Sequence, residues 1–334
     1  MNYYTSHPPF NKSSGITIAA VGTVSLAIQY GEVWQLILLQ GIGVGVGGGL
    51  LYMPVIFLLP QWFSRRRGLA GGIIFAGTGV GENVGLRWTL RVWAIGTSIV
   101  IGIALLGMRR RVPVPKYQPG MRRPRFIPPQ MQFLKTPLFW SFSITTVLQG
   151  LSYFPVSLYI ASFTKAISTS LSATVVLSLF NSSAVVGQIV MGHLSDRFPY
   201  PWIMVFSALG SGLAAFLLWG FSEAVGQIYA FVVIFGALSG GFSSMWPAAA
   251  ADCAGSHPEL VGVTFSCTAL VKGISAVVGP ILAGVLLEAG KSSSMGGVYG
   301  RLGYGAVEIF VGSTAIASAV GSTAVAITRQ SVMK

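Results

Sequence analysis

The sequence contains few charged residues. Only 9% of its 334 residues are Asp, Glu, Lys or Arg, and 53% are hydrophobic. In an average soluble domain about a quarter of the residues are charged. This balance excludes a water-exposed globular domain and predicts a protein that crosses a membrane several times.

Acidic residues, cysteines and histidines are also scarce. Eight acidic residues stand against 21 basic ones, which gives a net charge of +13. The two cysteines, Cys253 and Cys267, lie in or beside apolar runs, so no disulfide is implied. The three histidines, His7, His193 and His257, are not clustered with carboxylates, and no nucleophile–base or metal-ligand spacing occurs. We therefore expect neither an enzyme nor a metal or other cofactor, and a membrane enzyme is the least favoured alternative.

Basic residues are concentrated in one stretch, residues 109–137, which carries eight Lys or Arg residues and no acidic one. Its many prolines disfavour a regular helix, so we interpret it as a linker. A basic cluster can bind nucleic-acid phosphates, but this chain has no water-exposed domain to carry a groove, and we expect no nucleic-acid partner. Short loops rich in Lys and Arg stay on the cytoplasmic side of a membrane, which predicts a cytoplasmic linker between two apolar halves.

Apolar runs on both sides of the linker predict ten spans, of which the first, at 15 residues, falls short of the roughly 20 needed to cross. Four precede the linker (16–30, 33–59, 68–85 and 92–108), and six follow it (138–160, 173–191, 202–221, 228–251, 260–287 and 304–327). The expected fold is an all-α membrane protein with about ten transmembrane helices. It comprises a cytoplasmic tail (1–15), a four-span bundle (16–108), the linker (109–137), a six-helix bundle (138–327) and a second tail (328–334).

One short motif links this layout to a known family. At 192–197 the chain reads GHLSDR, directly after one predicted span and before the next. This resembles the loop between the second and third helices of each half of the major facilitator superfamily, whose pattern is G-x-x-x-D-R followed by basic residues. Gly192, Asp196 and Arg197 match the pattern, whereas Phe198-Pro199-Tyr200-Pro201 replaces the basic end. The resemblance implies that the three matching residues form a loop that takes part in conformational change.

Three longer stretches are similar to the monocarboxylate transporter-like family, particularly its fungal members. They are WFSRRRGLAGGIIFAGTGVG at 62–81, NSSAVVGQIVMGHLSDR at 181–197 and GPILAG at 279–284. The resemblance covers most of the chain from residue 16 and implies secondary transport of a small organic solute by alternating access. A monocarboxylate or related anion is the expected substrate, with a proton as a candidate co-substrate, in the plasma or vacuolar membrane. Residues 62–81 resemble the fourth-to-fifth helix junction of the family, so the first two helices of the family would be missing from this chain. The alternative hypothesis is therefore a non-transporting remnant or an incomplete gene model of such a transporter.

The resemblance also implies which helices line the substrate cavity, namely the first and fourth of the second half. These carry Gln149, Tyr153 and Trp246 in mid-span, which are therefore candidate substrate-lining residues, and packing is the alternative role for the aromatic pair. Asn181, on the second helix of this half, is a further candidate.

The Asp and Arg pair that animal monocarboxylate transporters carry on that second helix is absent. Ala184 and Gln188 stand at the corresponding positions, which puts proton-coupled lactate-type transport in doubt. Asn181 and Gln188 are more simply interpreted as polar packing contacts between helices.

Lys272 is the basic residue deepest inside a predicted span. It lies twelve residues from Leu260, about 18 Å along a helix, which is too far for its side chain to reach water at the membrane surface. A charge at that depth is costly and should face a polar cavity or a partner group. We expect Lys272 to attract a carboxylate substrate; the alternative is a neutral lysine buried among helices.

Two acidic residues flank the turn before residue 260. Asp252 and Glu259 are close enough in the predicted layout to reach Arg197 of the GHLSDR loop. An ion pair between these acidic residues and Arg197 would be either a gate that breaks and reforms during transport or a fixed structural contact.

The layout makes a topological prediction. Fifteen basic residues fall on the side of the linker and both termini, and five on the other side, so the linker side should be cytoplasmic. Single cysteines introduced at Gln118 and at Ser292 should react with an impermeant reagent from opposite sides of a sealed membrane, with Cys253 and Cys267 replaced in the background. Labelling of both from the same side would contradict the ten-span layout.

Overall fold

The computed structural model describes residues 131–333, except 256, 258–259 and 293–298. The four spans predicted before the linker, most of the linker itself and Glu259 lie outside these residues. Within the described part every regular element is a helix.

Six segments of this part are long and apolar enough to cross a membrane, which confirms the six spans predicted after the linker. The elements are η4 (Gln132–Lys135), α7 (Pro137–Ile167), α8 (Ser170–Ser195), α9 (Tyr200–Ala214), η5 (Ala215–Trp219), α10 (Val225–Gly241), η6 (Phe242–Met245), α11 (Trp246–Ala254), α12 (Val261–Ser292), η8 (Arg301–Gly303) and α13 (Gly305–Met333). The π-helical turn η5 continues α9, so the two together form the third span.

Hydroxyl side chains and a proline set where the first two spans begin. Thr136 caps α7, accepting a hydrogen bond from the Phe139 N–H at 3.4 Å, and Pro137 follows at the first helical position, where no N–H is required. Thr169 caps α8 in the same way through the Ser172 N–H at 3.3 Å. These caps satisfy backbone donors that a helix end would otherwise leave without partners.

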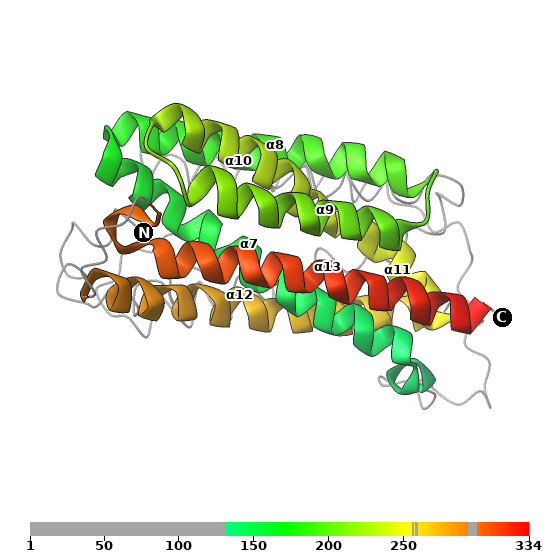
Figure 1. Ribbon diagram of the computed structural model, residues 1–334. Coiled ribbons are helices and arrows are strands. Elements are labelled where there is room, and N and C mark those ends of the chain that lie inside the picture. The colour runs from blue at the N-terminus through cyan, green and yellow to red at the C-terminus, as the bar shows by residue number, and fades with distance from the viewer. Residues whose placement is uncertain (1–130, 256, 258–259, 293–298, 334) are drawn as a thin grey trace, which may run out of the picture.

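The six spans form two layers (Figure 1). Helices α8, α9 and α10 pack together in one layer, and α7, α12 and α13 in the other. Helix α13 joins the layers because it packs against both α7 and α9 along much of its length. The bundle therefore has its own apolar interior, divided into a cluster at the end where α13 begins and a second cluster at the end where α13 finishes.

Small residues allow α8 and α10 to approach closely. A Cβ atom on Gly187 would collide with the backbone of Ala237, and one on Gly240 would collide with Ala184. Between membrane helices this close approach replaces the hydrophobic driving force that operates in water.

The fourth span crosses as predicted, but it is not one regular α-helix. The 3-10 turn η6 separates α10 from α11, and Pro247 follows in the first turn of α11. Gly240 and Gly241 precede the turn. A 3-10 segment inside a helix often marks a functional hinge.

The glycine packing gives a stability prediction. Gly187→Ala should lower the unfolding temperature of the purified protein, because the added methyl group must separate α8 from α10 at a cost of about 1–3 kcal/mol. Gly226→Ala is the matched control: nothing lies within 4 Å of its added Cβ, and alanine should favour the helix by about 0.5–1 kcal/mol. Equal unfolding temperatures for the two variants would mean that the α8–α10 approach is not tight.

Candidate functional site

Lys272 of α12 points its ammonium group into a group of aromatic rings. Its Nζ lies 5.5 Å from the ring centroid of Trp246, 5.6 Å from Phe154, and 5.9 Å from both Tyr153 and Phe242. A cation within about 6 Å of a ring face is attracted by the ring's quadrupole, by roughly 0.5–1 kcal/mol for each exposed pair. We call these five residues, together with Gln149, the lysine cage.

Gln149 of α7 completes the cage with a hydrogen bond. Its Oε1 accepts from Lys272 Nζ, and its Nε2 donates to the Ser239 carbonyl at 2.8 Å and to the Ser239 Oγ at 3.0 Å. Gln149 is only 3% exposed, so these bonds fix the direction in which its amide oxygen faces. The side chain thereby connects α7, α10 and α12 at one point.

Close packing of α7 on α12 determines where the lysine side chain runs. A Cβ on Gly150 would collide with Ser275 and would lie 3.6 Å from Lys272 Cδ. One turn beyond Ser275 on α12, a Cβ on Gly279 would be 3.4 Å from Leu151 Cα of α7. The missing side chains let the two helices touch next to the cage, which holds the lysine stem close to α7.

Two of the four rings come from the break in the fourth span. Phe242 begins the 3-10 turn η6, and Trp246 begins α11. The other two, Tyr153 and Phe154, directly precede Pro155, which lies inside α7. Interrupted helices are the usual way in which secondary transporters place binding groups near the middle of the membrane.

The cage can bind an anion because its cation is not neutralised within the part of the chain that the structure describes. None of the acidic side chains there forms an ion pair with Lys272, and its ammonium group donates to Gln149 Oε1. An ammonium group has three N–H donors, so two stay available to a carboxylate. The rings supply flat apolar surfaces around that position.

The structure brings together four of the five predicted substrate-lining residues. Gln149, Tyr153, Trp246 and Lys272 lie in the cage, whereas the Asn181 amide donates to the Leu177 carbonyl of its own helix at 3.1 Å. Sequence reasoning missed Phe242 and Ser239. The only signal for them was the glycine-rich run before Trp246, which weakens the helix there.

Asp252 forms an ion pair, but not with the predicted partner. Its carboxylate accepts from Arg329 Nε of α13 at 2.5 Å, and the predicted pairing of Glu259 with Arg197 lies outside the described residues. Arg329 also lies over the Tyr200 ring, 4.9 Å from its centroid. Because α11, α9 and α13 all belong to the same bundle, a rigid-body movement of that bundle would leave this pair intact, as expected of a structural contact.

The GHLSDR loop occupies the turn between α8 and α9. Gly192 is buried near the end of α8, Asp196 is the residue after its last turn, and the Arg197 N–H donates to the Leu194 carbonyl at 3.0 Å. The side chain of Arg197 is exposed.

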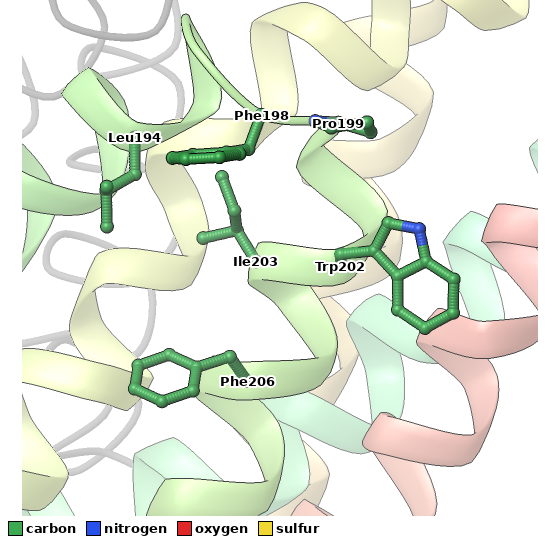
Figure 2. Close-up of a pocket in the computed structure, with 6 residues that line it drawn as sticks. All are labelled: Leu194, Phe198, Pro199, Trp202, Ile203 and Phe206. Carbon is green, nitrogen blue, oxygen red and sulfur yellow. The ribbon is translucent and has the colours of Figure 1, made fainter.

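The residues that replace the basic end of the motif help to form an apolar pocket of about 360 Å³ (Figure 2). It is lined by Leu194, Phe198, Pro199, Trp202, Ile203 and Phe206. Phe198, Trp202 and Phe206 are more than half exposed, and the lining carries no charged side chain. The pocket therefore belongs to the apolar outer surface and offers nothing to hold a charged solute.

Comparisons with known proteins agree with the arrangement of the helices. The sequence model of the Major Facilitator Superfamily matches residues 142–329. Relatives include the "Aspyridones efflux protein apdF" of Emericella nidulans (27% identical, 82% of this chain and 56% of the relative), the "MFS-type transporter pynF" of Aspergillus niger (27%, 83% and 64%) and the "MFS transporter asaE" of Aspergillus flavus (25%, 87% and 65%). The chain thus spans less than two thirds of the length of these three relatives.

A solved structure shares the fold. It is the crystal structure of a bacterial homologue of the human lysosomal transporter Spinster in an inward-facing, unoccupied conformation. That protein is 16% identical, with a TM-score of 0.53 over 95% of this chain and 81% of its own. At this identity the likeness concerns the fold alone.

The Asp252–Arg329 pair gives a prediction that separates an ion pair from two independent contacts. Asp252→Asn and Arg329→Gln should each lower the unfolding temperature, and the double variant should lose less than the sum. The expected coupling is on the order of 1 kcal/mol, because both side chains are partly exposed, at 30% and 24%. The coupling should weaken at high salt. Additive losses at low salt would show that the pair contributes no stability.

Proposed function

The chain belongs to the Major Facilitator Superfamily, and on this premise we propose that it is a secondary transporter of a small organic anion, whose carboxylate contacts Lys272. The substrate would bind in the middle of the membrane and be released by alternating access, in which one helical bundle rocks against the other. Within the superfamily we assign it to the monocarboxylate transporter-like family, because the stretches at 62–81, 181–197 and 279–284 resemble that family.

The observation that carries the proposal is the lysine cage. An ammonium group far from both ends of α12 would be very costly without compensation. Ring faces and one amide oxygen supply part of that compensation, and no carboxylate of the described chain supplies the rest. An anionic substrate would complete it, so binding should be strongest for solutes with a negative charge.

The rings suggest what the rest of the substrate is like. Flat apolar surfaces on several sides of Nζ favour an acid with an unsaturated or aromatic body over a small hydroxy acid. Gln149 would act as the alternate partner of Lys272 when no substrate is bound, because its oxygen already accepts from the ammonium. Substrate binding and release would then exchange one acceptor for another without exposing an uncompensated charge.

Transport should depend on the charge of Lys272. We expect reconstituted vesicles to carry unsaturated or aromatic monocarboxylates but not the neutral amides with the same skeletons. Lys272→Gln should lower kcat/KM at least tenfold, since a hydrogen bond to a charged group contributes about 1.5–3 kcal/mol, and Lys272→Arg should retain part of the activity. Lys291→Gln, an identical change at the exposed end of the same helix, should transport normally.

A binding measurement makes this test independent of transport. Acids that bind should raise the unfolding temperature of the purified chain and of Lys291→Gln, but not of Lys272→Gln. Stabilisation without transport would indicate a chain that binds its solute but does not move it. Full transport by Lys272→Gln would remove Lys272 from the substrate site, and transport of the amides at the same rate would contradict an anionic substrate.

A further inference from the structure

A second ionisable group lies buried in the bundle, at the end where α13 begins. Glu308 is in the first turn of α13 and has no exposed surface. Neither of its carboxylate oxygens has a hydrogen-bond partner among the described residues. An ionised carboxylate buried in this way, without donors or a counter-ion, would destabilise the fold by several kcal/mol.

A short loop covers the carboxylate. A Cβ on Gly300 would lie 3.6 Å from Glu308 Oε2, and the Gly300 N–H donates to the Gly220 carbonyl at the end of η5 at 3.1 Å. The Tyr299 ring packs edge-on against Phe221 with 5.0 Å between centroids. We call residues 299–304 the cap loop. Its backbone takes positive φ values at Gly300 (75°), Leu302 (61°) and Gly303 (79°), and at Leu302 this strains the chain.

The unpartnered polar atoms at this end of the bundle are compatible with a protonated, neutral Glu308. Five buried side-chain N or O atoms at this end of the bundle have no hydrogen-bond partner among the described residues: Trp219 Nε1, Ser222 Oγ, Tyr299 Oη and the two oxygens of Glu308. This concentration marks a small polar region in an otherwise apolar cluster. Burial, together with the nearby Glu308, raises the pKa of the Tyr299 phenol, which therefore stays an O–H group.

Among the residues that the structure describes, no charged side chain at this end neutralises Glu308. The charged residues that the structure describes there are all exposed, and none forms an ion pair with it: Lys165, Glu223, Glu288, Lys291 and Arg301. The tyrosines that lie nearest, Tyr299 and Tyr304, carry no positive charge. A metal ion is also a poor fit, because the described residues contain no cluster of three metal-binding side chains. An indole N–H such as that of Trp219 cannot be a metal ligand.

We propose that Glu308 is a proton-binding site, closed by the cap loop and occupied by a proton whenever the Gly300–Gly220 hydrogen bond is intact. Loss of the proton would leave an uncompensated charge and would favour separation of the cap loop from η5, which admits water. Proton exchange would then take place on the side of the membrane where α13 begins. This inference does not depend on the substrate or on the lysine cage, since Glu308 and Lys272 lie in different parts of the bundle.

The test is the pH dependence of unfolding of the purified full chain, compared with Glu308→Gln. The folded state keeps a proton on Glu308, whereas the unfolded chain releases it in the ordinary glutamate range near pH 4.3. Above that range the folded state binds more protons, so stability should fall as pH rises. The folded-to-unfolded ratio of the parent relative to Glu308→Gln should fall by up to tenfold for each pH unit between about pH 5 and the pH at which Glu308 loses its proton.

Controls distinguish this result from a general effect of charge. Glu288→Gln, an identical change at an exposed position of the same end, should keep the pH dependence of the parent. Glu308→Met, neutral and of similar volume, should behave like Glu308→Gln if the amide variant folds poorly. The infrared spectrum of the parent at pH 7 should contain the C=O stretch of a protonated carboxylic acid.

Three results would overturn the proposal. The first is the same pH dependence in the parent and in both Glu308 variants. The second is the absence of a protonated-acid band from the parent. The third is stabilisation of the parent by sodium over potassium at fixed pH, which would mean that the carboxylate holds a metal cation.

Discussion

A polar group inside a membrane-spanning bundle must find its partner within the protein, and this constraint governs most of what the structure contains. Backbone groups meet it by forming helices, which is why the described chain has no other regular element. Serine and threonine side chains meet it by donating to carbonyls three or four residues earlier, as Thr164 does to Ile160 and Thr268 to Thr264. Some polar side chains connect different helices instead, as Gln149 does to Ser239 and Ser207 to Leu238.

Three ionisable groups satisfy the constraint in three ways. Asp252 has the side chain of Arg329 as a counter-ion, near the end of the bundle. Lys272 has ring faces and an amide oxygen, which stabilise its charge while leaving two N–H donors available. Glu308 has neither within the part of the chain that the structure describes, which is the basis for inferring that a proton is its partner. The first arrangement suits a permanent contact, and the other two suit sites whose partner changes.

Close helix packing makes these arrangements possible. Lys272 reaches Gln149 because Gly150 lets α12 lie directly against α7, and the cap loop reaches Glu308 because Gly300 adopts a positive φ with no side chain in the way. Gly187 and Gly240 play the corresponding role between α8 and α10, which positions η6 and its aromatic residue Phe242. Glycine in this bundle thus determines which side chains meet.

The six spans of the second half and the depth of Lys272 could be predicted from the amino-acid sequence, because both follow from the length of apolar runs and the position of one charge along a helix. The sequence also identified Gln149, Tyr153 and Trp246 as neighbours of the site, through a family resemblance that assigns helices to the cavity wall. The partners of these side chains could be identified only in the folded chain. Ser239 bonds to a residue 90 positions away, Asp252 pairs with Arg329 instead of Arg197, and Phe242 joins the cage because a 3-10 turn interrupts its span. Such contacts depend on how helices rotate and how closely they pack, and the hydrophobicity of a single segment contains no information about either.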